Sequence, residues 1–233
     1  VITCIGGFNV NQILPRLDYD IIKNNPKILC GFSDITALLH AIYARTGLVT
    51  YHGPHFCTFG FDKEAEYTQS YFFKAVMNNS DFMIKPSQNS KQYYIIQEGK
   101  CEGTILGGNL CTLNLLQGTP YMPNLSDKIL FIEDDNIMGD YFVPEFDRNL
   151  QSLLQVYGAD TIRGIIFGRF DSTCKLDENV IRKIISNKIS SNIPVVFGVD
   201  FGHVFPMITF PIGGKVKISA KGQEVIINIF NVE

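Results

Sequence analysis

A short apolar strand that leads through a glycine into an amphipathic helix restricts the fold more than any other feature of this sequence. Residues 27–30 are the strand, and Gly31 permits a tight bend directly after it. Over residues 34–46 one helix face carries apolar side chains at the spacing i, i+3, i+4, i+7, namely Ile35, Leu38, Leu39 and Ile42. Gly47 suits the end of that helix. A strand and a helix with so short a connection are typical of an open parallel sheet.

Strands and helices alternate along the rest of the chain. Apolar runs predict strands at residues 1–5, 93–97, 105–106, 128–132, 163–167 and 194–199, and a closing hairpin over 215–219 and 224–230. Helices are expected at 9–17, 64–78, 146–157 and 177–185, with a turn at 107–109. The polar run 85–92 contains Pro86 and no apolar residue, which favours a loop or linker. Because the chain starts inside an apolar strand without Met, we expect an upstream segment to be missing.

Composition excludes several classes of protein. Of the 233 residues, 45% are hydrophobic and 18% are charged, which indicates a globular chain and not a disordered one. The net charge of −3 argues against binding to nucleic acid, and no apolar run is long enough to span a membrane. The six cysteines form no C-x-x-C pair, so no metal site is expected and a reducing cytosol is the simpler interpretation. Cys4 and Cys30 lie in apolar runs and are predicted to be buried.

Gly31-Phe32-Ser33-Asp34 is the sharpest local motif. A strand ends, a glycine allows the bend and a serine starts a helix, which is the context of a nucleophile elbow. Such a turn raises the hydroxyl above the backbone and directs the N–H groups of the helix N-terminus at an oxyanion. The usual elbow is G-x-S-x-G, whereas Ile35 occupies the last position here. On this tetrapeptide alone, a Ser33 that only caps the helix is the favoured interpretation.

A serine nucleophile needs a histidine base and an acid that orients the histidine. His203 follows the strand at 194–199, where ligands bind in such sheets, although an ordinary loop histidine has the same sequence signature. Glu133 ends the apolar run 129–132 and precedes two aspartates. A metal site, a nucleotide hydrolase and a solvated acidic turn are the alternatives, but matched metal ligands and a G-x-x-x-x-G-K-[ST] phosphate loop are both missing. Gly6-Gly7 permits either a close backbone approach or only a turn.

Together these segments resemble the LD-carboxypeptidase family of serine peptidases, which includes the microcin C immunity peptidases. The resemblance spans nearly the whole chain. Its most specific blocks are GFSDIT at 31–36 and Gly202-His203 followed by Pro206, Pro211 and Gly213. It also runs through IGGFN at 5–9, NPK at 25–27, HGP at 52–54, GGNL at 107–110, ILFIED at 129–134, FDR at 146–148 and GRF at 168–170.

The resemblance implies a role for five residues. Ser33 resembles the nucleophile, Glu133 the orienting acid and His203 the general base of this family. The backbone N–H groups of Gly7 and Asp34 would form the oxyanion hole. The Ile35 departure from the usual elbow agrees with the resemblance, since the elbow of this family is G-x-S-D.

The resemblance also implies an α/β fold of two domains. Residues 1–84 would be the remainder of an N-terminal domain with a parallel sheet and the elbow, and residues 85–100 a linker. Residues 101–233 would be a β-rich α/β domain that supplies the glutamate and the histidine. The family is usually cytosolic and often dimeric, so a cytoplasmic homodimer without a cofactor is expected.

Two substrate classes follow from the resemblance. The carboxypeptidase branch cleaves the amide between an L-centre and a terminal D-amino acid of a murein peptide, and the immunity branch cleaves an amide between an acidic residue and a nucleotide-like group. This chain lacks Trp, which stacks on the base in immunity peptidases, so the murein peptide is favoured. Asn109, Arg148 and His52 are the candidates for substrate binding. A catalytically inactive peptide-binding module is the remaining alternative.

Overall fold

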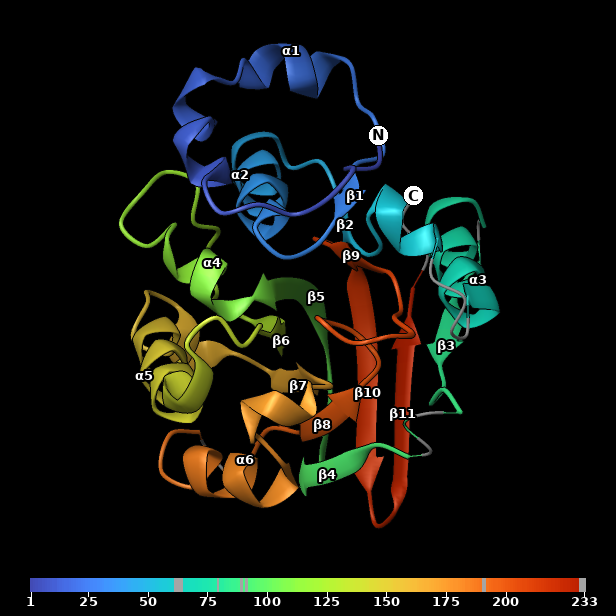
Figure 1. The fold of residues 1–233 in the computed structure, drawn as a ribbon, viewed down its shortest axis with the longest axis vertical. Coiled ribbons are helices and arrows are strands. Elements are labelled where there is room, and N and C mark those ends of the chain that lie inside the picture. The colour runs from blue at the N-terminus through green and yellow to red at the C-terminus, as the bar shows by residue number, and fades with distance from the viewer. Residues whose placement is uncertain (61–64, 79, 89, 91, 190–191, 231–233) are drawn as a thin grey trace.

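The computed structural model of the chain describes residues 1–60, 65–78, 80–88, 90, 92–189 and 192–230. Strands of these residues form two sheets, a small one of three strands and a large one of eight (Figure 1). In the view of Figure 1 the small sheet lies above the large one, under helices α1 (Tyr19–Asn24) and α2 (Ile35–Thr46). The α/β architecture predicted from the sequence is therefore confirmed.

The small sheet joins both ends of the chain. Its order is β1 (Cys30–Gly31), β2 (Thr50–His52) and β9 (Phe210–Ile212). β1 and β2 are parallel with α2 between them in sequence, as the strand–helix pattern predicts. β9 pairs antiparallel with β2 and brings the segment before it, which contains His203, beside the strand–helix turn at Ser33.

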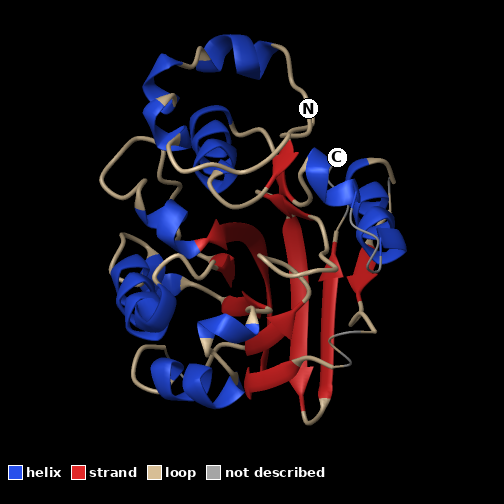
Figure 2. Cartoon of the chain, in the orientation of Figure 1, coloured by secondary structure: helices blue, strands red, loops and turns tan. Residues whose placement is uncertain are grey.

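The large sheet has a parallel centre and antiparallel edges. Its strands are, in order, β3 (Phe82–Ile84), β11 (Glu224–Ile229), β10 (Lys215–Lys221), β5 (Gly99–Asn109), β6 (Lys128–Glu133), β7 (Gly164–Gly168), β8 (Val195–Val199) and β4 (Tyr94–Gln97). Strands β5 to β8 are parallel to one another. Helices α4 (Leu110–Asn114), α5 (Phe142–Leu153) and α6 (Glu178–Ile185) lie together beside this parallel part (Figure 2). Helix α3 (Ala65–Val76) lies next to β3 at the other end of the sheet.

The local sequence explains why these elements form. β6 and β7 are apolar along nearly their whole length because both faces of the parallel centre are covered. In α5 the buried residues Phe146, Leu150 and Leu153 recur at helical spacing. Asp177 is the N-cap of α6, and its carboxylate accepts a hydrogen bond from the Val180 amide at 2.9 Å. Among the described residues, no helix has both the length and the apolar character needed to span a bilayer.

Two predictions near the N-terminus are wrong. Residues 1–5 do not form a buried strand. Only Ile2 pairs with Cys30 in a single β-bridge, and the side chains of Val1 and Ile5 are 71% and 69% exposed. The chain turns away after this bridge and brings Gly6 beside Ser33 instead. The predicted helix at 9–17 is two short 3₁₀ turns, because Pro15 lacks the amide hydrogen that a continuous helix needs.

The middle of the chain also differs from the sequence prediction in part. The predicted turn at 107–109 is the end of β5, because positive φ angles at Gly107 and Gly108 let this strand end pack against β6 and α2. The segment 85–100 predicted as a linker contains β4, which is the strand predicted at 93–97, and the first residues of β5, while residues 89 and 91 lie outside the described residues. The predicted helix at 64–78 is found as α3, while Glu64 lies outside the described residues. Cys30 is buried as predicted, but Cys4 is exposed.

Candidate active site

Ser33 lies in the sharp turn between β1 and α2. Its φ angle is +60°, in the left-handed region that costs a residue with a side chain roughly 1–2 kcal/mol. Asp34, not Ser33, is the N-cap residue of α2, and the Ser33 hydroxyl contacts a histidine instead. The interpretation of Ser33 as a simple helix cap is therefore wrong, and the strained serine fits a nucleophile elbow.

A chain of hydrogen bonds connects the three residues singled out in the sequence. Ser33 Oγ lies 3.0 Å from His203 Nε2. On the other side of the ring, His203 Nδ1 lies 2.8 Å from Glu133 Oε2. Glu133 ends β6 and His203 follows β8, at the carboxyl ends of two parallel strands of the large sheet. Ser33 follows β1 of the small sheet, and the pairing of β9 with β2 brings the His203 segment to it.

Burial and charge act against each other on this pair. Glu133 is fully buried, which opposes its ionisation, but the facing His203 ring outweighs this and lowers the pKa of the carboxyl. Burial likewise disfavours a charged His203, yet the Glu133 carboxylate raises the pKa of His203 to about 9. The arrangement therefore holds an ionised acid against a histidine that binds protons strongly.

Two glycines allow the close packing around these side chains. Gly202 has a φ angle of +106°, and a Cβ there would lie 2.9 Å from both Cβ and Oε2 of Glu133. A Cβ on Gly6 would lie 3.1 Å from Ser33 Cβ. A side chain at position 202 would thus push the histidine loop away from Glu133.

The two residues predicted to form the oxyanion hole lie next to each other. Asp34 Oδ2 accepts a hydrogen bond from the Val10 amide at 2.9 Å, which ties the segment after Gly7 to the elbow. A Cβ on Gly7 would lie only 3.0 Å from Asp34 Oδ2, so a glycine at this position lets the backbone approach Asp34 closely. Gly7 and Ser33 both line the same cavities.

Two cavities meet at Ser33. One of about 280 Å³ has side-chain amides and two aspartates in its lining, including Asn9, Asn109 and Asp135. The other, of about 370 Å³, is lined mainly by rings and small residues, including Phe32, His55 and Phe205. No Lys or Arg is among the described residues that line either one. The nucleophile candidate is therefore open to a ligand on two sides of different chemistry.

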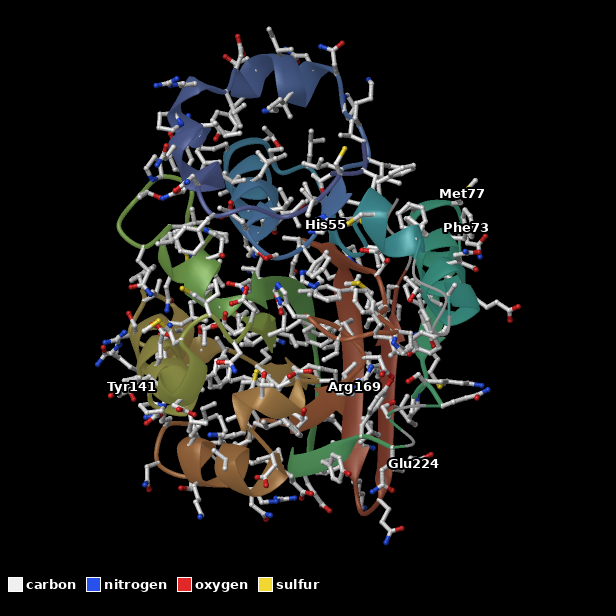
Figure 3. The ribbon with its side chains drawn as sticks, viewed as in Figure 1. His55, Phe73, Met77, Tyr141, Arg169 and Glu224 are labelled. Atoms are coloured by element: carbon white, nitrogen blue, oxygen red, sulfur yellow. The ribbon has the colours of Figure 1, made fainter. Side chains whose placement is uncertain are left out.

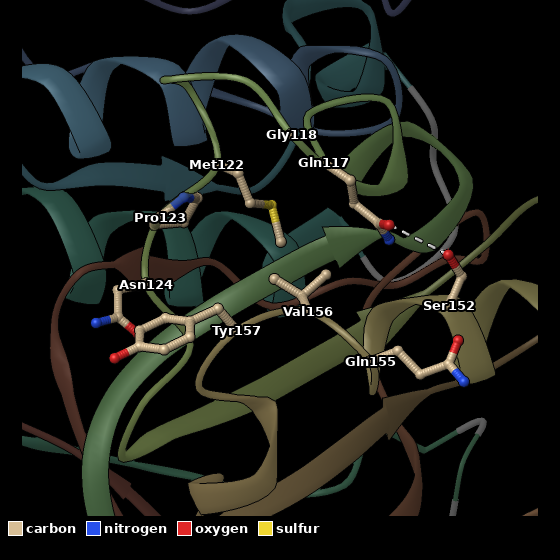
Figure 4. A pocket seen from close by; sticks show the side chains of 9 residues that line it. All are labelled: Gln117, Gly118, Met122, Pro123, Asn124, Ser152, Gln155, Val156 and Tyr157. Atoms are coloured by element: carbon tan, nitrogen blue, oxygen red, sulfur yellow. Dashed lines mark hydrogen bonds between the residues drawn. The ribbon is translucent and has the colours of Figure 1, made fainter.

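A larger cavity of about 500 Å³ lies elsewhere, between the segments that follow α4 and α5 (Figure 4). Its described lining is uncharged and includes Gln117 and Ser152, which are joined by a hydrogen bond of 3.2 Å. None of the sequence-predicted site residues lines this cavity. The groups that could carry chemistry gather at Ser33 instead.

His55, and not the predicted His52, faces the cavity. His52 is fully buried and stacks on Phe210 at 4.6 Å between ring centres. His55 lies at the small sheet (Figure 3), stacks on Phe32 at 4.3 Å and has Nδ1 2.7 Å from Thr3 Oγ1. Burial lowers the pKa of both histidines to about 4, so each is neutral at pH 7. The sequence HGPH contains both histidines, and no local signal indicates which ring faces the cavity.

The other predicted substrate-binding residues are separated by the fold. Asn109 lines the amide-rich cavity, and its side chain accepts the Thr112 amide at 2.9 Å to start α4. Arg148 lies on the outer face of α5, where its side chain is 75% exposed and pairs with Glu145 at 3.7 Å. It lines neither of the cavities at Ser33 because the buried face of α5 is the opposite one.

The two aspartates after Glu133, Asp134 and Asp135, have different surroundings. Asp134 is buried and accepts the Cys111 amide at 3.2 Å, and burial raises its pKa well above the usual range. Asp135 was not singled out by the sequence, yet its Oδ2 lies 3.3 Å from His203 Nε2. Burial also raises the pKa of Asp135. Among the described residues, no group of three or more His, Cys, Asp and Glu side chains has the arrangement of a metal site.

Two profiles of known protein families match this chain. The sequence profile of the LD-carboxypeptidase C-terminal domain matches residues 102–218, and that of the LD-carboxypeptidase N-terminal domain matches residues 1–53. The chain belongs to the LD-carboxypeptidase family. The matched ranges contain Ser33 in the N-terminal profile and both Glu133 and His203 in the C-terminal one.

Individual family members are similar over most of the chain. The putative carboxypeptidase YocD of Bacillus subtilis is 45% identical over 94% of this chain and 72% of its own length. The structure of an MccF-like protein from Bacillus anthracis has a TM-score of 0.95 and 42% identity, and covers 99% of this chain and 76% of that one. A structure of MccF in complex with glutamyl sulfamoyl guanosine has a TM-score of 0.81 at 31% identity, covering 99% and 75%.

Proposed function

We propose that this LD-carboxypeptidase family member is a serine peptidase whose catalytic triad is Ser33, Glu133 and His203. The observation that carries the proposal is the chain of hydrogen bonds from Ser33 Oγ through His203 to Glu133, at 3.0 and 2.8 Å. Neutral His203 takes the hydroxyl proton at Nε2 while Ser33 Oγ bonds to the amide carbonyl carbon. The C–N bond then breaks, His203 gives the proton to the leaving amine, and water hydrolyses the ester on Ser33.

The backbone amides of Gly7 and Asp34 are proposed to hold the oxyanion of the tetrahedral intermediate. Support comes from their place beside Ser33, since Asp34 N starts the helix and Gly7 lines both cavities. Helix N-termini favour negative charge, and preorganised donors at a developing oxyanion lower the barrier by about 3–4 kcal/mol. The bond from the Val10 amide to Asp34 supports this preorganisation.

We propose a murein peptide with a terminal D-amino acid as the substrate. The family membership supports this assignment, because LD-carboxypeptidase activity removes a D-amino acid from an L-centre. The amide-rich cavity beside Ser33 offers donors and acceptors for a peptide backbone.

An amide of an aminoacyl nucleotide is the second candidate substrate. MccF, which is similar to this chain, has been solved with glutamyl sulfamoyl guanosine. The second cavity at Ser33 carries Phe32, His55 and Phe205, and aromatic faces can stack on a base in place of tryptophan. Its described lining offers no Lys or Arg to the carboxylate of a leaving D-amino acid.

Mass spectrometry of the reaction products tests both candidates. The protein and its Ser33→Ala variant are incubated separately with a murein tetrapeptide and with an aminoacyl sulfamoyl adenosine. Loss of one D-alanine with the unsubstituted protein alone supports the murein assignment, and cleavage of the nucleotide analogue alone supports the second. Binding without cleavage of either compound by the folded protein would favour the inactive peptide-binding module.

Gly202→Ala is expected to impair both stability and turnover. The added Cβ meets Glu133 and the backbone keeps a positive φ angle, so we expect a loss of about 1–3 kcal/mol in unfolding free energy. Displacement of His203 by about 1 Å lowers kcat on the order of 100-fold.

Gly222→Ala is the matched control for Gly202→Ala. Gly222 also has a positive φ angle, +62°, but no atom lies within 4 Å of an added Cβ. Denaturant unfolding should show destabilisation of both variants, while only Gly202→Ala loses turnover. Equal kcat values for the two variants would contradict the packing argument.

A further inference from the structure

A buried polar cluster surrounds Asp200, away from the triad. The carboxylate of Asp200 is fully buried, and its oxygens contact six groups, which come from the residue after β7 and from the segments around α3 and β4. These partners are Arg169 Nε at 3.0 Å, Ser87 Oγ at 3.0 Å, the Ser87 amide at 2.9 Å, Ser90 Oγ at 2.7 Å, and the hydroxyls of Tyr67 and Tyr93 at 3.3 and 3.4 Å. Five hydrogen-bond donors and the ion pair with Arg169 hold the Asp200 carboxylate in one position.

Arg169 connects this fixed carboxylate to the loop that carries His203. It directly follows β7, and its own amide donates to Val199 O at 2.8 Å. Its Nη2 donates to Phe205 O at 2.9 Å and to Pro206 O at 3.3 Å. One guanidinium group therefore bridges Asp200 at the start of the loop and two carbonyls at its far side, just past the end of β7 (Arg169 is labelled in Figure 3).

Two backbone amides near the end of the same loop donate further hydrogen bonds, one to the start of the loop and one to α3. The Ile208 amide donates to Asp200 O at 2.6 Å, and the Met207 amide donates to Thr68 Oγ at 3.1 Å. His203 stands near the middle of this closed loop. The position of the loop therefore determines both of its bonds, the one to Glu133 and the one to Ser33.

We propose that Arg169, with Asp200 as its buried counter-ion, is the positioning residue for His203. This inference rests on the proposed function of the triad. Arg169 lines neither cavity at Ser33, and its side chain bonds to Asp200 and to two loop carbonyls, so we infer that it acts through the loop. Lysine cannot replace it, because a single ammonium lacks the fork that reaches Asp200 and the two carbonyls together.

Arg169→Lys is expected to lower kcat by about 10- to 100-fold with less than about a threefold change in KM, since small misplacement of a catalytic group costs rate. Asp200→Asn should have the same effect, because the arginine then loses its counter-ion. Arg182→Lys is the matched control. Arg182 also donates to two backbone carbonyls, those of Ile95 and Ile96 in β4, and pairs with Glu178, but it lies in α6 and not on the His203 loop.

Hydrogen exchange and the His203 titration are measured on the same proteins and need no activity. In Arg169→Lys the amides of residues 200–205, 207 and 208 should exchange faster, and the His203 pKa measured by NMR should fall from about 9 as Glu133 becomes more distant. Arg182→Lys should leave both unchanged. Unchanged exchange and His203 pKa in Arg169→Lys overturn the proposal, as does an unchanged kcat.

Substrate cleavage by the unsubstituted protein tests the proposed function independently of the role of Arg169. If the unsubstituted protein cleaves neither substrate class, the proposed function fails. The exchange and titration data then still decide whether Arg169 holds the His203 loop against Glu133.

Discussion

Replacing Ser33 with alanine is expected to lower kcat by at least about 10⁴-fold while the fold stays intact. Ser33 Oγ is the atom that lies 3.0 Å from His203 Nε2, and alanine removes it without adding volume. The remaining rate would come from the oxyanion hole and binding alone. Product formation is followed by mass spectrometry and folding by circular dichroism. A variant that keeps the full rate would exclude Ser33 as the nucleophile.

Two further variants make this test specific. Ser70→Ala changes an exposed serine in α3 and should keep the full rate. Ser33→Gly should be as inactive as Ser33→Ala but about 0.5–1 kcal/mol more stable, because glycine relieves the left-handed backbone at this position. Ser33→Ala combined with His203→Ala should lose little more than either change alone, since triad members act as a unit.

The elements that the sequence predicted correctly are those with a local signal. Helix α2, strands β6 to β8 and the closing hairpin each combine an apolar pattern with a turn or cap residue, so their boundaries can be read from neighbouring residues. The apolar run 1–5 has the same local pattern, but tertiary contact with Ser33 and Cys30 decides its path. Pattern alone therefore fails where a distant site fixes the backbone.

In the candidate site, too, some contacts could be predicted from the sequence and others depend on tertiary packing. Glu133 ends β6 and His203 follows β8, and the carboxyl ends of parallel strands in one sheet meet, so the proximity of these two residues could be expected. Ser33 follows a strand of the other sheet, and its contact with His203 is set by how the two sheets pack. The Asp200 cluster could not be expected either, because its serine partners are 113 and 110 residues away in sequence. The choice of His55 over His52 depends on which ring stacks on Phe32, which is again a tertiary contact. The homodimer, the cytoplasmic location and the domain boundaries stay predictions.

Replacing Glu133 with glutamine is expected to lower kcat on the order of 10⁴-fold, because the orienting carboxylate is lost while the shape is kept. The pH dependence should also change. His203 can accept the serine proton only when it is neutral, and the Glu133 carboxylate raises the pKa of His203 to about 9. In the unsubstituted protein kcat/KM should therefore rise with pH up to about 9. In Glu133→Gln this rise should move to lower pH, towards the ordinary histidine pKa of about 6.5.

Asp135→Asn separates the effect of charge from the effect of orientation. The Asp135 carboxylate also raises the pKa of His203, but less than Glu133 does, and it lies on the Nε2 side. Its removal should shift the pH profile slightly downward and leave the Nδ1 bond to Glu133 in place. We therefore expect a small change in kcat for Asp135→Asn and a large one for Glu133→Gln. If both variants shift the pH profile and reduce kcat equally, Glu133 acts only as a charge and not as the residue that orients His203.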